Sequence, residues 1–187
     1  MKKIISTAIA ACTLGLTFSL ANADHHGEAN NGSFVIPKAE VDSTLLQGLA
    51  NLSEGRSVSD IVVRHVDVGD EYMGVSVVQR SKVEITEAET GISHTDLDEI
   101  YYIVAGAGTM VTGGAFIEPT ELNSNLLGPM LRGEIHGGVL QKVEVGDIAI
   151  IPKGMPHGWH EISTDTISYI IFRGDPNEVM AVKNSAD

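Results

Sequence analysis

The feature that most constrains this chain is a succession of short apolar runs, rich in β-branched residues, that begins near residue 57 and is punctuated by glycine turns. Branched side chains pack well on a pleated surface, so runs of this kind predict strands. Glycine turns at residues 106–108 and 146–147 predict two β-hairpins. Strands are predicted over residues 57–66, 72–85, 99–105, 109–112, 143–145, 148–151 and 166–172. So many short strands predict an all-β chain folded as an antiparallel barrel or sandwich.

Two segments depart from this pattern. Residues 41–54 carry apolar side chains at helical spacing, with Asp42 or Ser43 as the N-cap and Gly55 as the stop, which predicts one short amphipathic helix. Residues 113–138 contain two prolines and several glycines. We expect a long loop there, because binding loops and lids often have this length and composition.

The charge of the chain excludes several classes of partner. Its 187 residues include 12 lysines and arginines against 25 aspartates and glutamates, a net charge of −13. Nucleic acids and anionic membrane surfaces are recognised by basic clusters, and the sequence contains none. We therefore expect no nucleic-acid partner, and the length favours one domain.

The N-terminus has the pattern of a bacterial signal peptide. Two lysines precede an apolar stretch over residues 4–20, and residues 21–23 (ANA) match an A-x-A cleavage site. A transmembrane anchor over the same stretch and a lipoprotein at Cys12 are the alternatives. Cleavage after Ala23 leaves no cysteine, and ten basic against 25 acidic residues give a net charge of −15. A cysteine-free chain suits an oxidising compartment, so we expect a periplasmic or secreted protein with no membrane anchor after cleavage.

Residues 146–160 (GDIAIIPKGMPHGWH) hold the more specific of two chemically informative motifs. Pro152, Gly154 and Pro156 turn and stiffen the backbone immediately before His157. A surface histidine does not need this rigidity. The segment therefore favours a histidine aimed at a site over one satisfied by a backbone hydrogen bond.

The second motif, residues 94–106 (HTDLDEIYYIVAG), places His94 just before a strand whose first residue is Glu99. Side chains alternate along a strand, so Glu99, Tyr101 and Ile103 share one face. A carboxylate on an otherwise apolar face needs a compensating charge, and a metal ion would supply one.

Together these motifs resemble those of the cupin superfamily. Residues 146–157 match the second cupin motif, G-x5-P-x-G-x2-H, at every fixed position, whereas the asparagine that usually follows is replaced by Glu161. Residues 94–106 resemble the first motif, H-x-H-x3,4-E-x6-G, except that its first histidine is replaced by Ile92. The resemblance covers about residues 60–173. It implies a double-stranded β-helix, a small jelly-roll barrel that holds one divalent transition metal.

The resemblance also implies the metal ligands, which are His94, Glu99 and His157, while Ile92 cannot ligate. Two imidazoles and one carboxylate suit non-haem Fe(II), which we favour, although imidazole also suits Zn, Ni or Cu and a carboxylate suits Mn. An alternative triad uses Asp96 in place of the glutamate, as in oxoglutarate-dependent oxygenases built on a related barrel. Asp96 otherwise reads as a solvated turn residue.

Several other side chains are candidates for the site. Tyr101 and Trp159 are expected beside the motif glutamate and the motif histidine, as pocket walls with a substrate role or as core aromatics. His136, in the predicted loop, is a candidate catalytic acid or base or an extra ligand, and otherwise a solvated histidine. Arg132 in the same loop is a candidate partner for a substrate carboxylate. His160 is expected on the opposite strand face from the motif histidine.

These residues lead to two functional hypotheses. The first is a metal-dependent enzyme, of oxygenase, isomerase or lyase type, that acts on a small organic molecule. The second is a non-catalytic cupin that binds a metabolite or only a metal, which the replacement at Ile92 favours. We divide the chain into a signal peptide (1–23), a flexible segment (24–40) and one cupin barrel domain (41–187) with its motif core at 90–173.

Two further expectations concern assembly and the mature N-terminus. The helix and the strands before the first motif exceed a minimal barrel, and such additions in cupins often pair across a two-fold axis, so we expect a homodimer. Cleavage after Ala23 would expose residues 24–26 (DHH). A free amine, two amide nitrogens and a third-position imidazole suit square-planar Cu(II) or Ni(II), whereas the plainer reading of this segment is a mobile polar tail.

Overall fold

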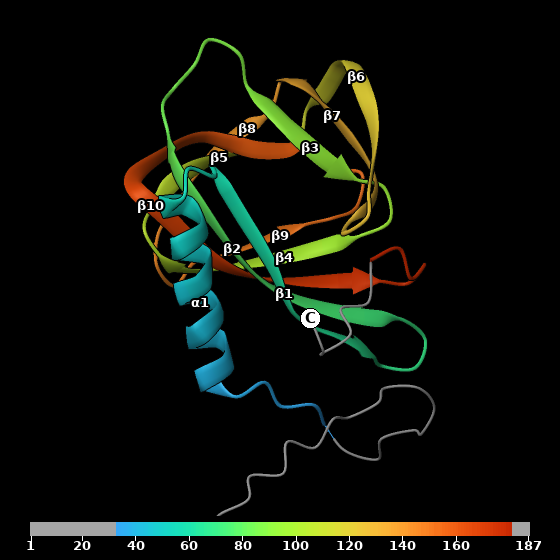
Figure 1. The fold of residues 1–187 in the computed structure, drawn as a ribbon. Coiled ribbons are helices and arrows are strands. Elements are labelled where there is room, and N and C mark those ends of the chain that lie inside the picture. The colour runs from blue at the N-terminus through green and yellow to red at the C-terminus, as the bar shows by residue number, and fades with distance from the viewer. Residues whose placement is uncertain (1–32, 181–187) are drawn as a thin grey trace, which may run out of the picture. The chain divides into compact units, whose positions relative to one another are not determined.

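The computed structural model describes residues 33–180, which form one helix and ten strands (Figure 1). The predicted all-β class is confirmed, because the strands pair as antiparallel ladders throughout. The elements are α1 (Lys38–Ser53), β1 (Val58–Asp67), β2 (Tyr72–Val83), β3 (Thr90–His94), β4 (Asp98–Ala105), β5 (Gly108–Thr112), β6 (Ala115–Ser124), β7 (Gly128–His136), β8 (Val139–Val143), β9 (Ile148–Ile151) and β10 (His157–Asp175).

Strand β10 organises the barrel because it belongs to two sheets. Its first part, from His157 to Ile162, pairs with β3 and β5, and its second part, from Thr166 onward, pairs with β2 and β4. Between these parts the strand bends, so that its two ends return to the same end of the barrel (Figure 1). The hydrogen bonds form one continuous ten-stranded sheet, and β10 joins its two parts, β1-β2-β10-β4-β9 and β6-β7-β3-β10-β5-β8, which we call the two sheets of the barrel.

The two predicted hairpins are wrong, although three of their strands are present; of the strand predicted at residues 143–145, only Val143 is in a strand, at the end of β8. β4 pairs with β10 and β9, whereas β5 pairs with β10 and β8, so strands joined by a glycine turn lie in different sheets. Gly106 makes this crossing possible: its φ is +81°, and an added Cβ would lie 2.3 Å from the carbonyl oxygen of Thr166 on β10. The turn passes so close to β10 that only glycine fits. It carries the chain from one sheet to the other.

The long loop predicted at residues 113–138 is also wrong. This segment forms the antiparallel pair β6–β7, and β6 lies at the sheet edge with mostly exposed side chains. Pro119 lies at the irregularity in pairing between Ile117 and Thr120, where a missing N–H costs no regular ladder bond. Pro119 is thus accommodated at a bulge in an edge strand, and Pro129 lies near the start of β7 opposite Asn123.

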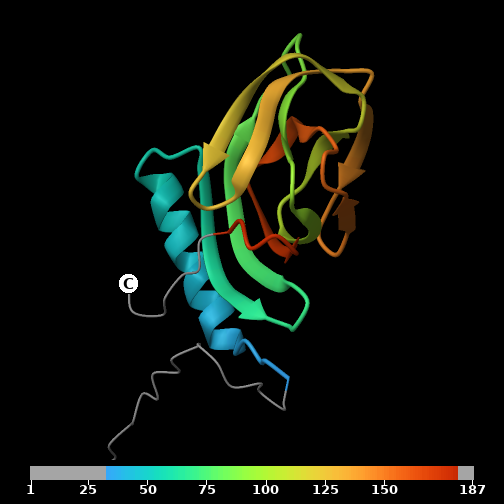
Figure 2. The same ribbon diagram turned by 90° about the vertical axis from the view of Figure 1, so that its right-hand side faces the viewer.

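Helix α1 packs against β1 and β2 (Figure 2). It begins at Lys38, earlier than predicted, and neither proposed cap is used, because the carbonyl oxygen of Pro37 accepts the first backbone bonds instead. It ends before Gly55, as predicted. At Gly48 the helix approaches the sheet so closely that a Cβ would lie 1.8 Å from Gln79 Oε1. Within the described part of the chain, no helix is long and apolar enough to span a bilayer.

The barrel interior follows the alternation predicted for β4. Glu99, Tyr101 and Ile103 are 1%, 5% and 0% exposed, whereas Ile100 and Tyr102 between them are each 40% exposed. The interior is completed by buried apolar side chains of the two sheets, including Val78, Met110, Ile151, Ile162, Ile167, Tyr169 and Ile171. A carboxylate therefore does lie on the inner face of an apolar barrel, as the alternation along the strand predicted.

Candidate metal centre

Three potential metal ligands converge at one end of the barrel. His94 ends β3, Glu99 lies at the start of β4, and His157 begins β10. His94 Nε2 lies 3.5 Å from Glu99 Oε1, and His157 Nε2 lies 3.4 Å from Glu99 Oε2. All three residues are buried, and one ligand atom from each lies within 4.8 Å of the others. The structure thus brings together the three residues that the motifs predicted.

The loop before β10 positions these residues because it is bonded to the first motif. The Gly154 N–H donates to the carbonyl oxygen of His94 at 2.7 Å, and the Lys153 N–H donates to Asp98 Oδ1 at 2.9 Å. Gly154 has φ +78°, a conformation that favours glycine. The rigid turn inferred from the sequence therefore docks one motif onto the other.

The imidazole of His157 is left as a metal site requires. The Nδ1–H of His157 donates to the carbonyl oxygen of Met155 at 3.0 Å, which leaves a lone pair on Nε2. That Nε2 atom and His94 Nδ1 are buried without a hydrogen-bond partner among residues 33–180. Ligand atoms about 2.1 Å from a shared transition metal lie about 3.0–3.5 Å apart, and each imidazole Nε2 lies at such a distance from one oxygen of Glu99. The donor set therefore fits a divalent transition metal held by His94, Glu99 and His157.

A residue that the sequence analysis missed provides charge compensation for Glu99. Arg173, 2% exposed at the far end of β10, donates from Nε to Glu99 Oε1 at 2.8 Å. It also donates to Ser76 Oγ at 3.0 Å and to Asp60 Oδ2 at 2.8 Å. The Tyr101 hydroxyl donates to Glu99 Oε2 at 2.8 Å. Each carboxylate oxygen keeps a second lone pair, so Glu99 can still ligate a metal.

Burial and these neighbours set the protonation states of the site. Burial would raise the pKa of Glu99, but Arg173 and the two imidazoles outweigh it and hold that pKa well below its usual range. Burial lowers the pKa of His94 to about 4. Burial and the adjacent Glu99 charge raise the pKa of Tyr101 well above its ordinary value. At neutral pH the site therefore holds a carboxylate, a neutral His94 and a protonated phenol, as metal ligation requires.

The other candidates lie apart from these three ligands. Asp96 accepts a hydrogen bond from Asn177 Nδ2 at 2.8 Å and is not part of the convergent group. His136 is exposed at the end of β7 and pairs with Glu134, 2.6 Å away. His160 bonds Glu89. Arg132 is exposed. Ile92 is partly buried and lies opposite His157 in the pairing of β3 with β10. The ring centroid of Trp159 lies 5.8 Å from that of Tyr169.

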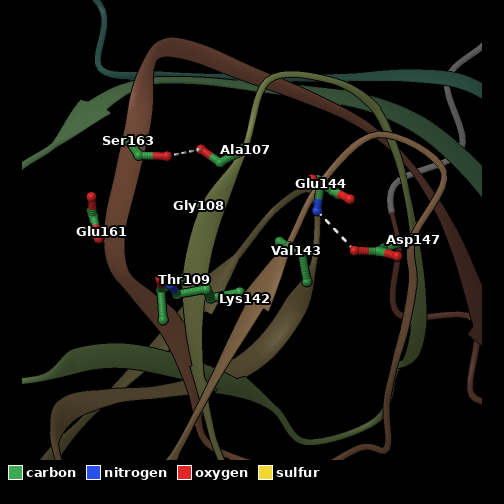
Figure 3. Close-up of a pocket in the computed structure, with 9 residues that line it drawn as sticks. All are labelled: Ala107, Gly108, Thr109, Lys142, Val143, Glu144, Asp147, Glu161 and Ser163. Carbon is green, nitrogen blue, oxygen red and sulfur yellow. Dashed lines mark hydrogen bonds between the residues drawn. The ribbon is translucent and has the colours of Figure 1, made fainter.

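A hollow of about 440 Å³ lies elsewhere and contains none of the three ligands (Figure 3). It is lined by Ala107, Gly108, Thr109, Lys142, Val143, Glu144, Asp147, Glu161 and Ser163. Two hydrogen bonds join residues of its lining, from Ser163 Oγ to the Ala107 carbonyl oxygen at 3.1 Å and from the Glu144 N–H to Asp147 Oδ2 at 2.8 Å. The convergent ligands, not this hollow, define the candidate site.

Comparison with known proteins gives weak structural likeness only. No protein-family model matches the chain, and no curated protein matches it. Solved structures similar to it include DMSP lyase DddQ from Ruegeria pomeroyi, with 15% identity over 65% of this chain and 49% of that one at a TM-score of 0.41. KdgF from Halomonas sp. has 16% identity over 64% and 82% at 0.39. Hydroxypropylphosphonic acid epoxidase from S. wedmorenis has 13% identity over 54% and 42% at 0.38.

This chain therefore spans about half the length of the lyase and less of the epoxidase. Likeness at these TM-scores carries no conclusion about activity. The architecture rests instead on the shared strand β10, the crossings between sheets and the buried His–Glu–His group. These define a cupin-type jelly-roll barrel.

Proposed function

We propose that this chain is an exported single-domain cupin-type protein that binds one divalent transition metal through His94, Glu99 and His157. The observation that carries the proposal is the convergence of three buried ligand atoms, one of them the unpartnered Nε2 of His157. An unsatisfied buried ring nitrogen is costly, and a metal would satisfy this one. Two imidazoles with one carboxylate favour Fe(II) among the candidates, with Mn, Zn, Ni and Cu as the other choices.

The same site supports a catalytic role on a small organic molecule, of oxygenase, isomerase or lyase type. A bound metal would supply Lewis acidity or redox chemistry at the barrel end. The protein's own contribution is positional: Tyr101 and Arg173 hold the two oxygens of Glu99 in place, and the loop at Gly154 holds His157. Such support is what preorganised sites need.

A non-catalytic metal-binding or metabolite-binding cupin is the second candidate. Two observations favour it. Ile92 stands where the first motif would provide another histidine, and Arg173 already neutralises Glu99 without a metal. Both features weaken metal affinity relative to a site with a fourth protein ligand.

Metal analysis tests the proposal. The mature protein, purified without a histidine tag, should contain about one transition metal per chain, and His157→Ala should lose most of it because only two ligands remain. The matched control is His136→Ala, since that exposed histidine pairs with Glu134 away from the site. Full metal content in His157→Ala would show that the metal binds elsewhere in the chain. Oxygen consumption with candidate metabolites then separates the enzyme from the binding protein.

The proposed homodimer is supported by the outer face of the barrel. Ile100 and Tyr102 on β4, Ile148 and Ile150 on β9, and Phe172 on β10 are exposed and adjacent in register. An uncharged patch on so acidic a chain is a surface where two copies can meet without like-charge repulsion. The signal peptide and the copper-binding N-terminus lie outside the described residues and remain predictions.

A further inference from the structure

Two arginines point into the barrel, and they differ in how their nitrogens are used. Arg173 donates from Nε and both terminal nitrogens to Glu99, Ser76 and Asp60. Arg80 donates only from Nε, to Tyr169 Oη at 3.0 Å. Across residues 33–180 the two terminal nitrogens of Arg80 have no hydrogen-bond or ion-pair partner, and neither is sealed from solvent.

Arg80 lies on the same inner wall as the candidate metal centre. It shares the inward-facing side of β2 with Ser76 and Val78, and its phenol partner Tyr169 is 1% exposed. The ring of Tyr169 stacks on that of Tyr101 at a centroid distance of 4.9 Å. Since Tyr101 bonds Glu99, Arg80 is joined to a metal ligand through two stacked phenols.

A partly buried guanidinium whose two terminal nitrogens make no hydrogen bond is unusual. Charged groups inside proteins are normally paired, because removing them from water costs several kcal/mol per ion. Here the Nε bond fixes the plane of the guanidinium, while both terminal N–H groups remain available. A fixed fork of this kind matches the two oxygens of a carboxylate or phosphate.

The charge balance of the barrel favours the same conclusion. Within residues 33–180, Asp60 and Glu99 are bonded to Arg173. Arg80 adds a second guanidinium through Tyr169, so two negative and two positive charges balance. Asp60 is already committed to Arg173 at 2.8 Å. A bound divalent metal would add two positive charges to this balanced set in a poorly solvated interior. An anionic ligand would reduce that excess.

We infer that Arg80 anchors the oxyanion group, a carboxylate or a phosphate, of a small organic ligand bound inside the barrel. The inference rests on the proposed function and names the class of ligand for that site. Tyr169 and Trp159, with ring centroids 5.8 Å apart, provide the adjoining aromatic wall for the ligand's carbon atoms. The sequence candidate Arg132 is exposed on β7, and the hollow of Figure 3 carries Lys142 among three carboxylates, so neither offers a comparable fork.

Calorimetric titration with succinate and with inorganic phosphate tests this assignment and separates the two oxyanions. Wild-type protein should bind at least one of them saturably at millimolar concentration, and more tightly with its metal than after chelation. Arg80→Gln should weaken that binding about tenfold or more, because two charge-assisted bonds are lost. Arg80→Lys should lie between, since it keeps the charge without the fork. The matched control Arg132→Gln should bind as wild type does.

Two measurements keep the outcome interpretable. Metal content and thermal melting of the Arg80 variants should match wild type, which excludes a folding defect. If Arg80→Gln loses its fold, Arg80→Lys and Tyr169→Phe carry the test, the latter because it frees the guanidinium plane. Equal affinity in wild type and the folded Arg80 variants, or no binding of either anion to wild type, would overturn the inference. Anion binding to Arg80 in a protein that holds no metal would refute the proposed metal site while leaving the anion anchor standing.

Discussion

Replacing Arg173 by methionine should be among the most damaging single changes in this protein. Methionine has similar length and fits an apolar interior, but it removes the arginine that bonds Glu99. Glu99 is 1% exposed, so solvent cannot replace the lost partner, and Asp60 loses its bonds to the same guanidinium. The perturbation therefore leaves one fully buried and one mostly buried carboxylate without compensation.

The magnitude follows from this burial. Removing one member of a buried ion pair costs about 3–5 kcal/mol, because the remaining charge stays desolvated. For a domain of this size, such a loss lowers the melting temperature by roughly 10 °C. Part of the cost should be recovered by adding a divalent metal, which would place a positive charge beside Glu99 again.

Urea unfolding of the chelated mature protein measures the effect. Trp159 is the only tryptophan and packs against the core, so its fluorescence reports on the barrel. The double variant Arg173→Met with Glu99→Gln should be more stable than Arg173→Met alone, because the amide carries no charge. Arg132→Met, an exposed arginine, is the control and should change the free energy of unfolding little. A loss below about 1 kcal/mol in Arg173→Met, or no recovery in the double variant, would refute the electrostatic reasoning.

Three further predictions follow, two from the structure and one from the sequence of the mature N-terminus. In the metal-free protein, burial lowers the pKa of His94 to about 4. The unfolded chain therefore binds more protons between about pH 4 and 6.5, and stability should rise by about 3 kcal/mol across that range; a flat profile, or an unchanged rise in His94→Gln, contradicts this. Light scattering should give a dimer that Ile150→Lys dissociates, because the charge would enter the apolar patch, and a wild-type monomer at micromolar concentration would exclude it. Deleting residues 24–26 should remove one Cu(II) equivalent without changing the barrel metal, and identical copper titrations of the two forms would exclude that site.

Much of the site could be predicted because its signals are local. The alternation in residues 99–105 places Glu99 and Tyr101 inward, and the turn residues before His157 aim its imidazole. Arg173 and Arg80 carried a weaker signal of the same kind. Each arginine lies at a position whose side chain points to the same face as the inward apolar residues of its strand. From the sequence alone, such an arginine is equally consistent with a solvated strand end.

The sequence by itself determined the all-β class, the alternation of the strand that carries Glu99, and the residues expected to carry the metal chemistry, because these features depend on neighbours along the chain. Only the tertiary structure decided how the strands pair. The turn at Gly106 crosses between sheets because β10 passes beside it, and residues 113–138 become strands because each completes the other's ladder. Backbone hydrogen bonds between distant segments leave no local pattern. For the same reason, the bend in β10 that brings His157 and Arg173 to one carboxylate could not be predicted from either segment alone.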